Sequence, residues 1–120
     1  MVEKEQKNKD CVFCKIIAGD IPADKIYDSD NFIVMNDAHP VAVGHCLIIP
    51  KKHFVNLLDL PSTLGTELLD IVKKQSLRLI KEKKAEGFNI LQNNFKAAGQ
   101  VVMHSHLHII PRKNNDGLKV

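Results

Sequence analysis

Apolar side chains recur every three or four residues between positions 64 and 79, with mostly polar residues between them. This spacing predicts a long amphipathic helix, because it places the apolar residues on one face. Ser62 or Thr63 could cap its start, and Gly87 is expected to end it. Its predicted inner face consists of Leu64, Leu68, Ile71, Val72, Gln75 and Leu79, and the lysines that suit its negative end are Lys81, Lys83 and Lys84.

Five short apolar stretches, bounded by turn-forming residues, predict strands. Residues 11–18 predict a short helix, capped by Asp10 and ended by Gly19. Only the third and fourth strands are separated by a long helix, so the pattern indicates an α+β fold. We expect a five-stranded, mostly antiparallel sheet with one long and one short helix. The predicted strands are residues 26–28, 32–36, 45–49, 88–92 and 101–110.

The last predicted strand carries histidines at alternate positions, His104, His106 and His108. Alternate side chains of a strand share a face, so a strand would set these imidazoles in a row, roughly 6.5–7 Å apart. Leu107 and Ile109 would lie on the other, buried face. Packing requires no such row. It suits a metal ion, an anion such as phosphate, or proton-transfer chemistry.

Composition limits the class of protein. At 120 residues and 44% hydrophobic content, we expect one domain over residues 11–120, preceded by a mobile charged tail at residues 1–10. The net charge of +3 is compatible with anionic substrates, but no basic block alternates with aromatic residues, so no nucleic-acid partner is expected. No apolar stretch approaches the roughly 20 residues of a membrane span, so no membrane partner is expected.

The odd number of cysteines argues against a disulfide scaffold and favours a reducing, cytoplasmic location. Cys11 and Cys14 form a C-x2-C pair, which is half of a metal site. Cys46 lies in an apolar strand and is expected in the core.

The open edges of a small sheet tend to pair with other chains. We therefore expect a homodimer with twofold symmetry, in which two edges join into one continuous sheet.

Three separated motifs resemble the histidine triad (HIT) family, and most closely its Hint branch of nucleotide phosphoramidases. They are CVFCKIIAGDIP at residues 11–22, GHCLIIPKKH at 44–53 and GQVVMHSHLHIIPR at 99–112. A lone HxHxH would be less specific, because cupin-like metal sites also use His-x-His. Together the motifs span nearly the whole chain in the family's order. The resemblance implies a nucleotide hydrolase that needs no cofactor for catalysis.

By this resemblance, His106 attacks the α-phosphorus of a purine nucleoside 5′-monophosphoramidate and forms a covalent nucleotidyl-histidine, which water hydrolyses. His108 and His45 match histidines that contact the phosphate oxygens and the leaving group, and His104 buttresses the nucleophile. The substrate-binding residues implied in the same way are Asn93 and Gln100 for the phosphate, Asp37 for the ribose, and Phe13, Ile16, Met35, Asn36 and Ala38 for the purine.

Val101 departs from the family pattern, in which Ser or Thr at this position touches the phosphate or the leaving group. Loss of one such donor costs on the order of 10²-fold in rate. The chain also ends soon after Arg112, where family members often continue with a segment that tunes specificity. Both observations leave the leaving group open.

Three alternatives to a phosphoramidase therefore stay open. The first is a dinucleoside polyphosphate hydrolase or nucleotidyl transferase that uses the same nucleophile. The second is a non-catalytic nucleotide-binding module. The third is a metal-dependent enzyme with the three histidines on one ion.

In bacterial-type members of the family, histidines that match His53 and His104 join the cysteine pair. Two thiolates and two imidazoles form a closed, tetrahedral and therefore structural zinc site. The resemblance thus implies structural Zn²⁺ on Cys11, Cys14, His53 and His104. The alternative is that Cys14 faces the core and Cys11 is an exposed thiol.

Overall fold

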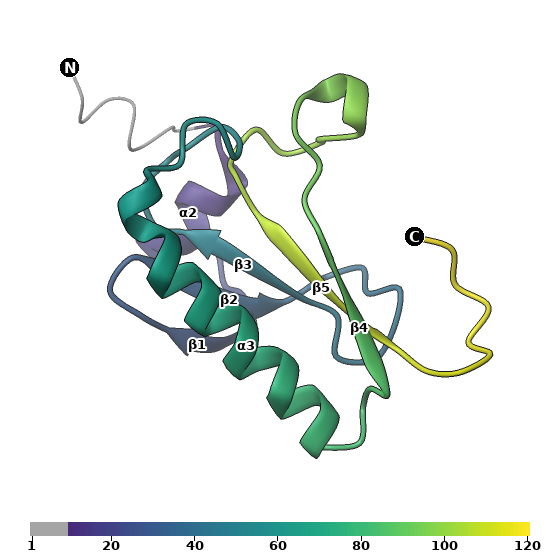
Figure 1. Ribbon diagram of the computed structural model, residues 1–120. Coiled ribbons are helices and arrows are strands. Elements are labelled where there is room, and N and C mark those ends of the chain that lie inside the picture. Colours follow the sequence, from purple (N-terminus) through teal and green to yellow (C-terminus); the bar gives the residue numbers. More distant parts are fainter. Residues whose placement is uncertain (1–9) are drawn as a thin grey trace.

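A computed structural model describes residues 10–120 and contains one five-stranded sheet, with a helix over each face (Figure 1). The strand order is β1-β2-β3-β5-β4, and every neighbouring pair is antiparallel. The predicted fold class is confirmed. The elements are α2 (Val12–Ala18), β1 (Lys25–Asp28), β2 (Phe32–Asn36), β3 (Cys46–Pro50), the 3₁₀ turn η1 (Ser62–Leu64), α3 (Gly65–Lys81), β4 (Gly87–Leu91), the 3₁₀ turn η2 (Lys96–Ala98) and β5 (Leu107–Arg112).

The predicted charged tail at residues 1–10 lies outside the described part of the chain, apart from Asp10. Within the described part, no helix is both long enough and apolar enough to cross a membrane.

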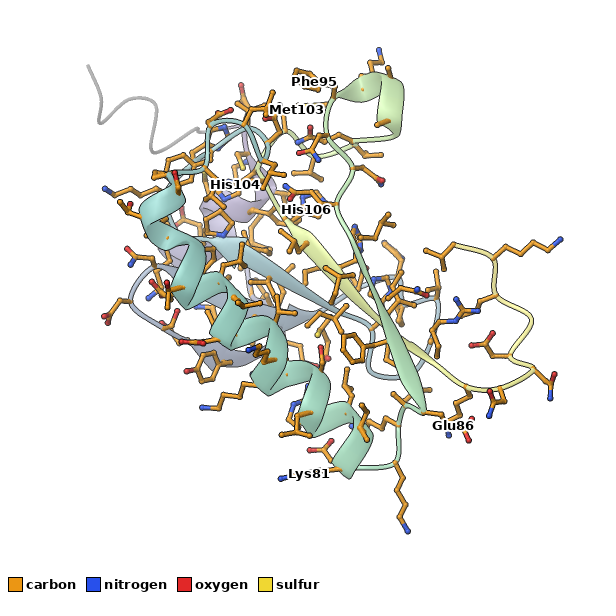
Figure 2. All side chains as sticks on the ribbon, in the orientation of Figure 1. Lys81, Glu86, Phe95, Met103, His104 and His106 are labelled. Atoms are coloured by element: carbon orange, nitrogen blue, oxygen red, sulfur yellow. The ribbon has the colours of Figure 1, made fainter. Side chains whose placement is uncertain are left out.

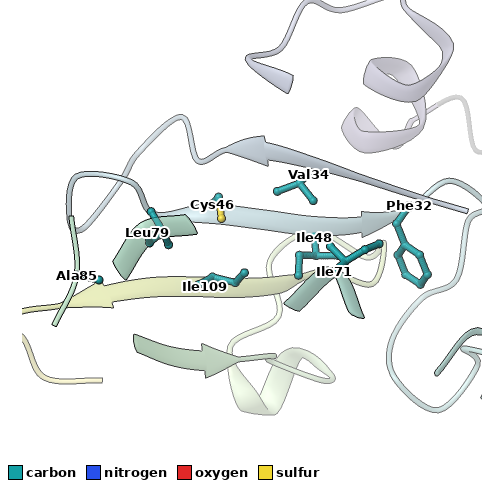
Figure 3. Close-up of a cluster of buried hydrophobic side chains, with 8 residues drawn as sticks. All are labelled: Phe32, Val34, Cys46, Ile48, Ile71, Leu79, Ala85 and Ile109. Carbon is teal, nitrogen blue, oxygen red and sulfur yellow. The ribbon is translucent and has the colours of Figure 1, made fainter. Parts of the chain in front are cut away.

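Two layers of buried side chains hold the helices to the sheet. Successive residues of β3 point to opposite faces, so Cys46 and Ile48 pack toward α3 while Leu47 and Ile49 pack toward α2. The pairing of Leu47 with His108 places His108 on the α2 face. The α3 layer, drawn in Figure 3, consists of Phe32, Val34, Cys46, Ile48, Ile71, Leu79, Ala85 and Ile109. The α2 layer consists of Cys11, Phe13, Ile16, Ile33, Met35, Leu47 and Ile49.

The long helix is shorter at both ends than predicted. Neither Ser62 nor Thr63 caps it, because residues 62–64 form a 3₁₀ turn without a side-chain cap. It ends at Lys81 rather than near Gly87, because Lys83 turns to a left-handed φ of 61°. The amide of Lys84 then donates to the carbonyl of Leu79, 2.9 Å away, which satisfies the last helical turn.

The short helix begins at Val12 and is capped by Cys11 rather than by Asp10. The Cys11 Sγ accepts the amide of Cys14 at 3.3 Å. Gly19 ends the helix as predicted, with a φ of 85° and its amide donating to the Ile16 carbonyl.

The last strand begins at Leu107, six residues later than predicted at 101, so His104 and His106 precede it. The expected row of imidazoles on one strand is therefore wrong. The backbone amide of Ser105 donates to the Phe54 carbonyl, and the His104 ring, rather than a backbone amide, contacts the Pro50 carbonyl. These contacts hold residues 104–106 in an irregular segment at the end of β3.

Candidate active site and metal cluster

His106 is held with one ring nitrogen free for chemistry. Its Nδ1 lies 2.8 Å from the backbone carbonyl of His104. A carbonyl only accepts, so Nδ1 carries the proton, and in the neutral ring the lone pair is on Nε2. The Phe13 ring packs edge-on against this imidazole, with centroids 5.1 Å apart. The lone pair on His106 Nε2 is thus available for nucleophilic attack.

His45 and His108 form a directional chain of hydrogen bonds that starts at the backbone. The Val41 amide donates to His45 Nδ1 at 3.1 Å, so the neutral His45 ring carries its proton on Nε2. That nitrogen is 2.9 Å from His108 Nδ1 and donates to it. His108 therefore carries its own proton on Nε2, where it is available to an anionic substrate.

This chain of hydrogen bonds requires both imidazole rings to be neutral. Burial lowers the pKa of His45, against the carboxylate of Asp37, which raises it. Burial also lowers the pKa of His108 to about 4, with His106 and His45 acting in the same direction and Asp37 against them. Both imidazoles are then neutral near pH 7, as the assigned proton positions require.

Asp37 lies beside this pair. Its Oδ2 is 3.3 Å from His45 Nε2 and 3.8 Å from His108 Nδ1, and its Oδ1 accepts the backbone amide of His39. His45 is buried, and both its nitrogens are engaged by protein atoms. No ring nitrogen of His45 is thus left for the direct phosphate contact predicted for it.

A second cluster lies at the other end of β3 and joins α2 to the triad. His104 donates through Nε2 to the Pro50 carbonyl at 2.8 Å, which leaves the Nδ1 lone pair pointing into the cluster. This Nδ1 is 3.2 Å from Cys11 Sγ, 3.5 Å from Cys14 Sγ and 3.2 Å from His53 Nδ1. Figure 2 shows His104 close to His106, with which it shares the short segment before β5.

The spacing of these atoms fits a tetrahedral ion. With Zn–N near 2.05 Å and Zn–S near 2.3 Å, tetrahedral edges are about 3.3 Å for N···N and about 3.6 Å for S···N. The four ligand atoms all lie within 4.8 Å of one another, and Cys14 Sγ is 3.2 Å from His53 Nδ1. Burial lowers the pKa values of His53 and, to about 4, of His104, so both rings are neutral near pH 7 and can act as ligands. The lone pair on His104 Nδ1 points into the cluster. His53 would present a second lone pair through Nδ1 if its proton is on Nε2. The residues that could hold such an ion are Cys11, Cys14, His53 and His104.

The described residues do not place the three triad histidines around one point. His104 belongs to the group with two cysteines, His108 to a separate group with Asp37 and His45, and His106 to neither. This separation argues against the alternative in which all three bind one ion.

The predicted purine residues are only partly brought together. Phe13, Ile16 and Met35 pack in the α2 layer, where Phe13 touches the ring of His106. Asn36 instead donates through its amide to Asp24, and Ala38 is exposed in the following loop. The α2 layer thus brings one of the three apolar residues, Phe13, against the ring of His106.

Gln100 shapes a loop rather than presenting its amide to a phosphate. Its Oε1 accepts the Phe95 amide, and its Nε2 donates to the carbonyls of Val55 and Val102. All of these partners are backbone atoms, and the side chain is buried. Asn93 lies near Gly99, at whose position a Cβ would be 3.7 Å from the Asn93 amide nitrogen.

Sequence reasoning missed the role of Val41, because a backbone amide leaves no signal in residue type. Val101 is 87% exposed, so it makes little contact within the chain.

Comparisons with known proteins agree with this geometry. A model of the HIT domain matches residues 18–115. The adenylylsulfatase HINT3 of Arabidopsis thaliana is 43% identical over 117 residues, which are 98% of this chain but only 59% of that protein, so the chain spans less than two thirds of its length. The adenosine 5′-monophosphoramidase HNT1 of Candida albicans is 42% identical over 108 residues, 87% of this chain and 71% of that protein. A zinc-bound histidine triad family protein from Mycobacterium smegmatis superimposes with a TM-score of 0.86 at 40% identity, covering 92% of this chain and 80% of that one.

Proposed function

Because this chain belongs to the HIT family, we propose that it is a nucleotide hydrolase that cleaves the P–N bond of purine nucleoside 5′-monophosphoramidates. The observation that carries the proposal is the orientation of His106, whose Nδ1–H is bound to the His104 carbonyl and whose Nε2 is left as a nucleophile. The relative named adenosine 5′-monophosphoramidase supports the substrate class.

In the proposed reaction, His106 Nε2 forms a bond to the α-phosphorus as the bond from phosphorus to the leaving nitrogen breaks. The amine leaves with a proton supplied by a neighbouring acid, and water then cleaves the nucleotidyl-histidine to release the nucleoside monophosphate and the free imidazole. The Nε2–H of His108 stabilises charge on the phosphoryl oxygens, and His45 fixes the tautomer of His108. No metal takes part in these steps.

We assign the nucleoside to the surface beside His106. Phe13, Ile16 and Met35 would form the purine wall, and one Asp37 oxygen would accept a ribose hydroxyl in place of the His39 amide. Asn93 would add a donor near the phosphate.

A second candidate differs only in the leaving group. The relative named adenylylsulfatase favours an adenylyl sulfate, and a diadenosine polyphosphate would use the same nucleophile. Val101, which carries no hydroxyl, leaves protonation of the leaving group to other donors. Sulfate and phosphate leaving groups are stable anions, so they need a proton less than a leaving amine does. This candidate therefore fits the presence of valine, instead of Ser or Thr, at position 101.

The experiment that tests the function traps the intermediate. The protein is mixed with α-³²P-labelled adenosine 5′-phosphoramidate, quenched in alkali, and examined for an acid-labile adduct on His106 by mass spectrometry. His106→Ala should form no adduct and lose turnover by at least about 10³-fold, while still binding AMP. AMP binding without hydrolysis by the unmodified protein would instead favour a binding module.

Comparison of kcat/KM on adenosine phosphoramidate, adenylyl sulfate and diadenosine polyphosphate then selects the leaving group. A preference for the phosphoramidate supports the first candidate, and a preference for the sulfate or the polyphosphate supports the second.

We also propose that Cys11, Cys14, His53 and His104 hold a structural zinc ion. It would supply a cross-link between α2 and the segment that carries the triad, and no catalytic chemistry. Elemental analysis of protein purified without added metal should find about one zinc per chain, and Cys14→Ser should lower both the zinc content and the melting temperature. Zinc far below stoichiometry, with full stability in strong chelator, would refute the site.

β4 ends the strand order, and its Phe88 and Ile90 side chains are exposed on the face that carries α3. The other edge, β1, exposes the charged Lys25 and Asp28 instead. We therefore assign the homodimer contact to β4, which would join two sheets into one. The odd number of cysteines, three, argues against a disulfide scaffold and favours a cytoplasmic location.

A further inference from the structure

A cavity of about 440 Å³ lies between the loop before β3 and the segment after β5, and no histidine lines it. Its apolar lining residues include Val41, Val43, Pro111 and Leu118. The two valines are 53% and 78% exposed, so their apolar surface is open to a ligand. Cavities of this size hold small molecules rather than protein surfaces.

Three lysines line the same cavity, Lys83, Lys84 and Lys113. Lys84 pairs with Glu82 at 3.3 Å, but neither Lys83 nor Lys113 has an ion-pair partner among residues 10–120. The cavity therefore combines an apolar wall with unneutralised positive charge.

The single acidic residue of the lining does not offset these cations. Asp116 accepts hydrogen bonds from Arg112 at 2.8 and 2.9 Å, and from the backbone amides of Lys113 and Leu118. These bonds lower the pKa of Asp116, so it stays ionised and committed to Arg112. An added anion would meet lysines rather than a free carboxylate.

The backbone of Lys83 gives an independent indication. With a φ of 61°, Lys83 occupies the position after α3 where glycine is free of strain. A lysine there costs conformational energy that a glycine would avoid, and its side chain contributes charge to the cavity. Strain of this kind is found where a side chain has a use.

The cavity wall is also preformed. Gly44 has a φ of 93°, and a Cβ at its position would lie 2.8 Å from Leu79 Cδ2 and 3.4 Å from Pro111 Cγ. The backbone of the loop thus packs directly on α3 and β5. A ligand would meet a fixed wall and would not have to order the loop.

From these observations we propose that the cavity binds a small organic dianion with an apolar body, of the phosphate monoester type. The lysines would bind the phosphate, and the body would cover Val41 and Val43. Inorganic phosphate lacks the apolar part, and a neutral aromatic molecule lacks the charge. The proposal does not depend on the proposed hydrolase activity.

Phenyl phosphate is a suitable probe, titrated into ¹⁵N-labelled protein in the presence of saturating AMP. The amides of Val41, Val43, Lys113 and Leu118 should shift with a single saturating isotherm. Inorganic phosphate and benzyl alcohol should each bind at least about tenfold more weakly at these amides. If the hydrolase proposal failed, the shifts of Lys113 and Leu118 would still appear, because these residues line the cavity and no described contact joins them to the histidines.

The variant Lys83→Gly tests whether the Lys83 side chain binds the ligand or only supports the fold. It removes the positive charge from the cavity and at the same time relieves the strain of the positive φ. It should fold with unchanged or higher stability, yet bind phenyl phosphate about tenfold more weakly. Lys96→Ala, in the distant η2 turn, is the matched control and should bind as the unmodified protein does. Absence of saturable shifts at the cavity, unchanged binding by Lys83→Gly, or equal binding of inorganic phosphate would overturn the proposal.

Discussion

Each histidine of the site is fixed by what its second nitrogen contacts. A backbone carbonyl holds the proton of His106 on Nδ1, while a backbone amide leaves the proton of His45 on Nε2. Backbone groups thereby suit identical side chains to the two proposed roles, nucleophile and donor. The proton positions follow from the neighbours and not from the imidazoles themselves.

His45 is accordingly a positioning residue. His45→Ala should lower kcat by about 10²-fold with little change in KM, because His108 loses the donor that fixes its tautomer. His45→Gln should recover part of this loss, since its amide N–H can replace Nε2–H. Steady-state kinetics checks both, with His39→Ala as a control that should leave both constants unchanged. Equal loss in the alanine and glutamine variants would contradict the assignment.

The lowered pKa of His108 also predicts a pH dependence of stability. The folded imidazole takes up its proton only near pH 4, whereas the unfolded one does so near 6.5. Between these values the unfolded chain holds more protons, so the free energy of unfolding should fall as the pH drops from about 6.5 to about 4. Urea unfolding at several pH values checks this, and His108→Gln should show a shallower fall. An equal fall in both proteins would assign the effect to other groups.

At the scale of elements, the hydrophobic pattern predicted most of the fold. β2 has the predicted bounds, and the heptad-like spacing located α3, because periodicity reports directly on the buried face. The start of β5 was wrong for a physical reason. Alternating histidines imitate a strand, but the ring of His104, not a backbone amide, takes the Pro50 carbonyl. A contact 54 residues apart in sequence leaves no local pattern.

The candidate site was predictable to a similar extent. The resemblance pointed to Asp37, His45 and His108, which the structure groups together, and separately to the two cysteines with His53 and His104. The ring centroid of His106 lies 5.2 Å from that of His108. The motifs did not reveal that the Gln100 amide is used up by backbone atoms, because that depends on how the loop over residues 93–102 closes.

That loop contains a strained aromatic residue. Phe95 has φ 72° and ψ 156°, a region occupied almost only by glycine, and its side chain is 55% exposed. Phe95→Gly should therefore raise the free energy of unfolding by about 1 kcal/mol, the relief of strain exceeding the added freedom of the unfolded chain. Phe95→Ala keeps the Cβ and should bring no gain. Urea unfolding checks the pair, and a gain with alanine would show that strain is not the cause.

At the scale of the molecule, the sheet has one charged edge and one apolar edge. Sedimentation at micromolar concentration should find a dimer, and Phe88→Lys with Ile90→Lys should produce a monomer, because lysines at both positions would bring like charges together across the edge. Lys25→Glu, on β1, should leave the dimer intact. A monomeric unmodified protein, or dissociation by the β1 change, would reject the β4 contact.

The short loop that contains Val41 and Val43 contributes to two sites. The amide of Val41 holds His45, and the side chains of Val41 and Val43 line the lysine-rich cavity. Because both sites use this loop, an effector that displaced it would alter nucleotide affinity. Reciprocity then follows from thermodynamics, since a nucleotide must change the affinity for the effector by the same factor.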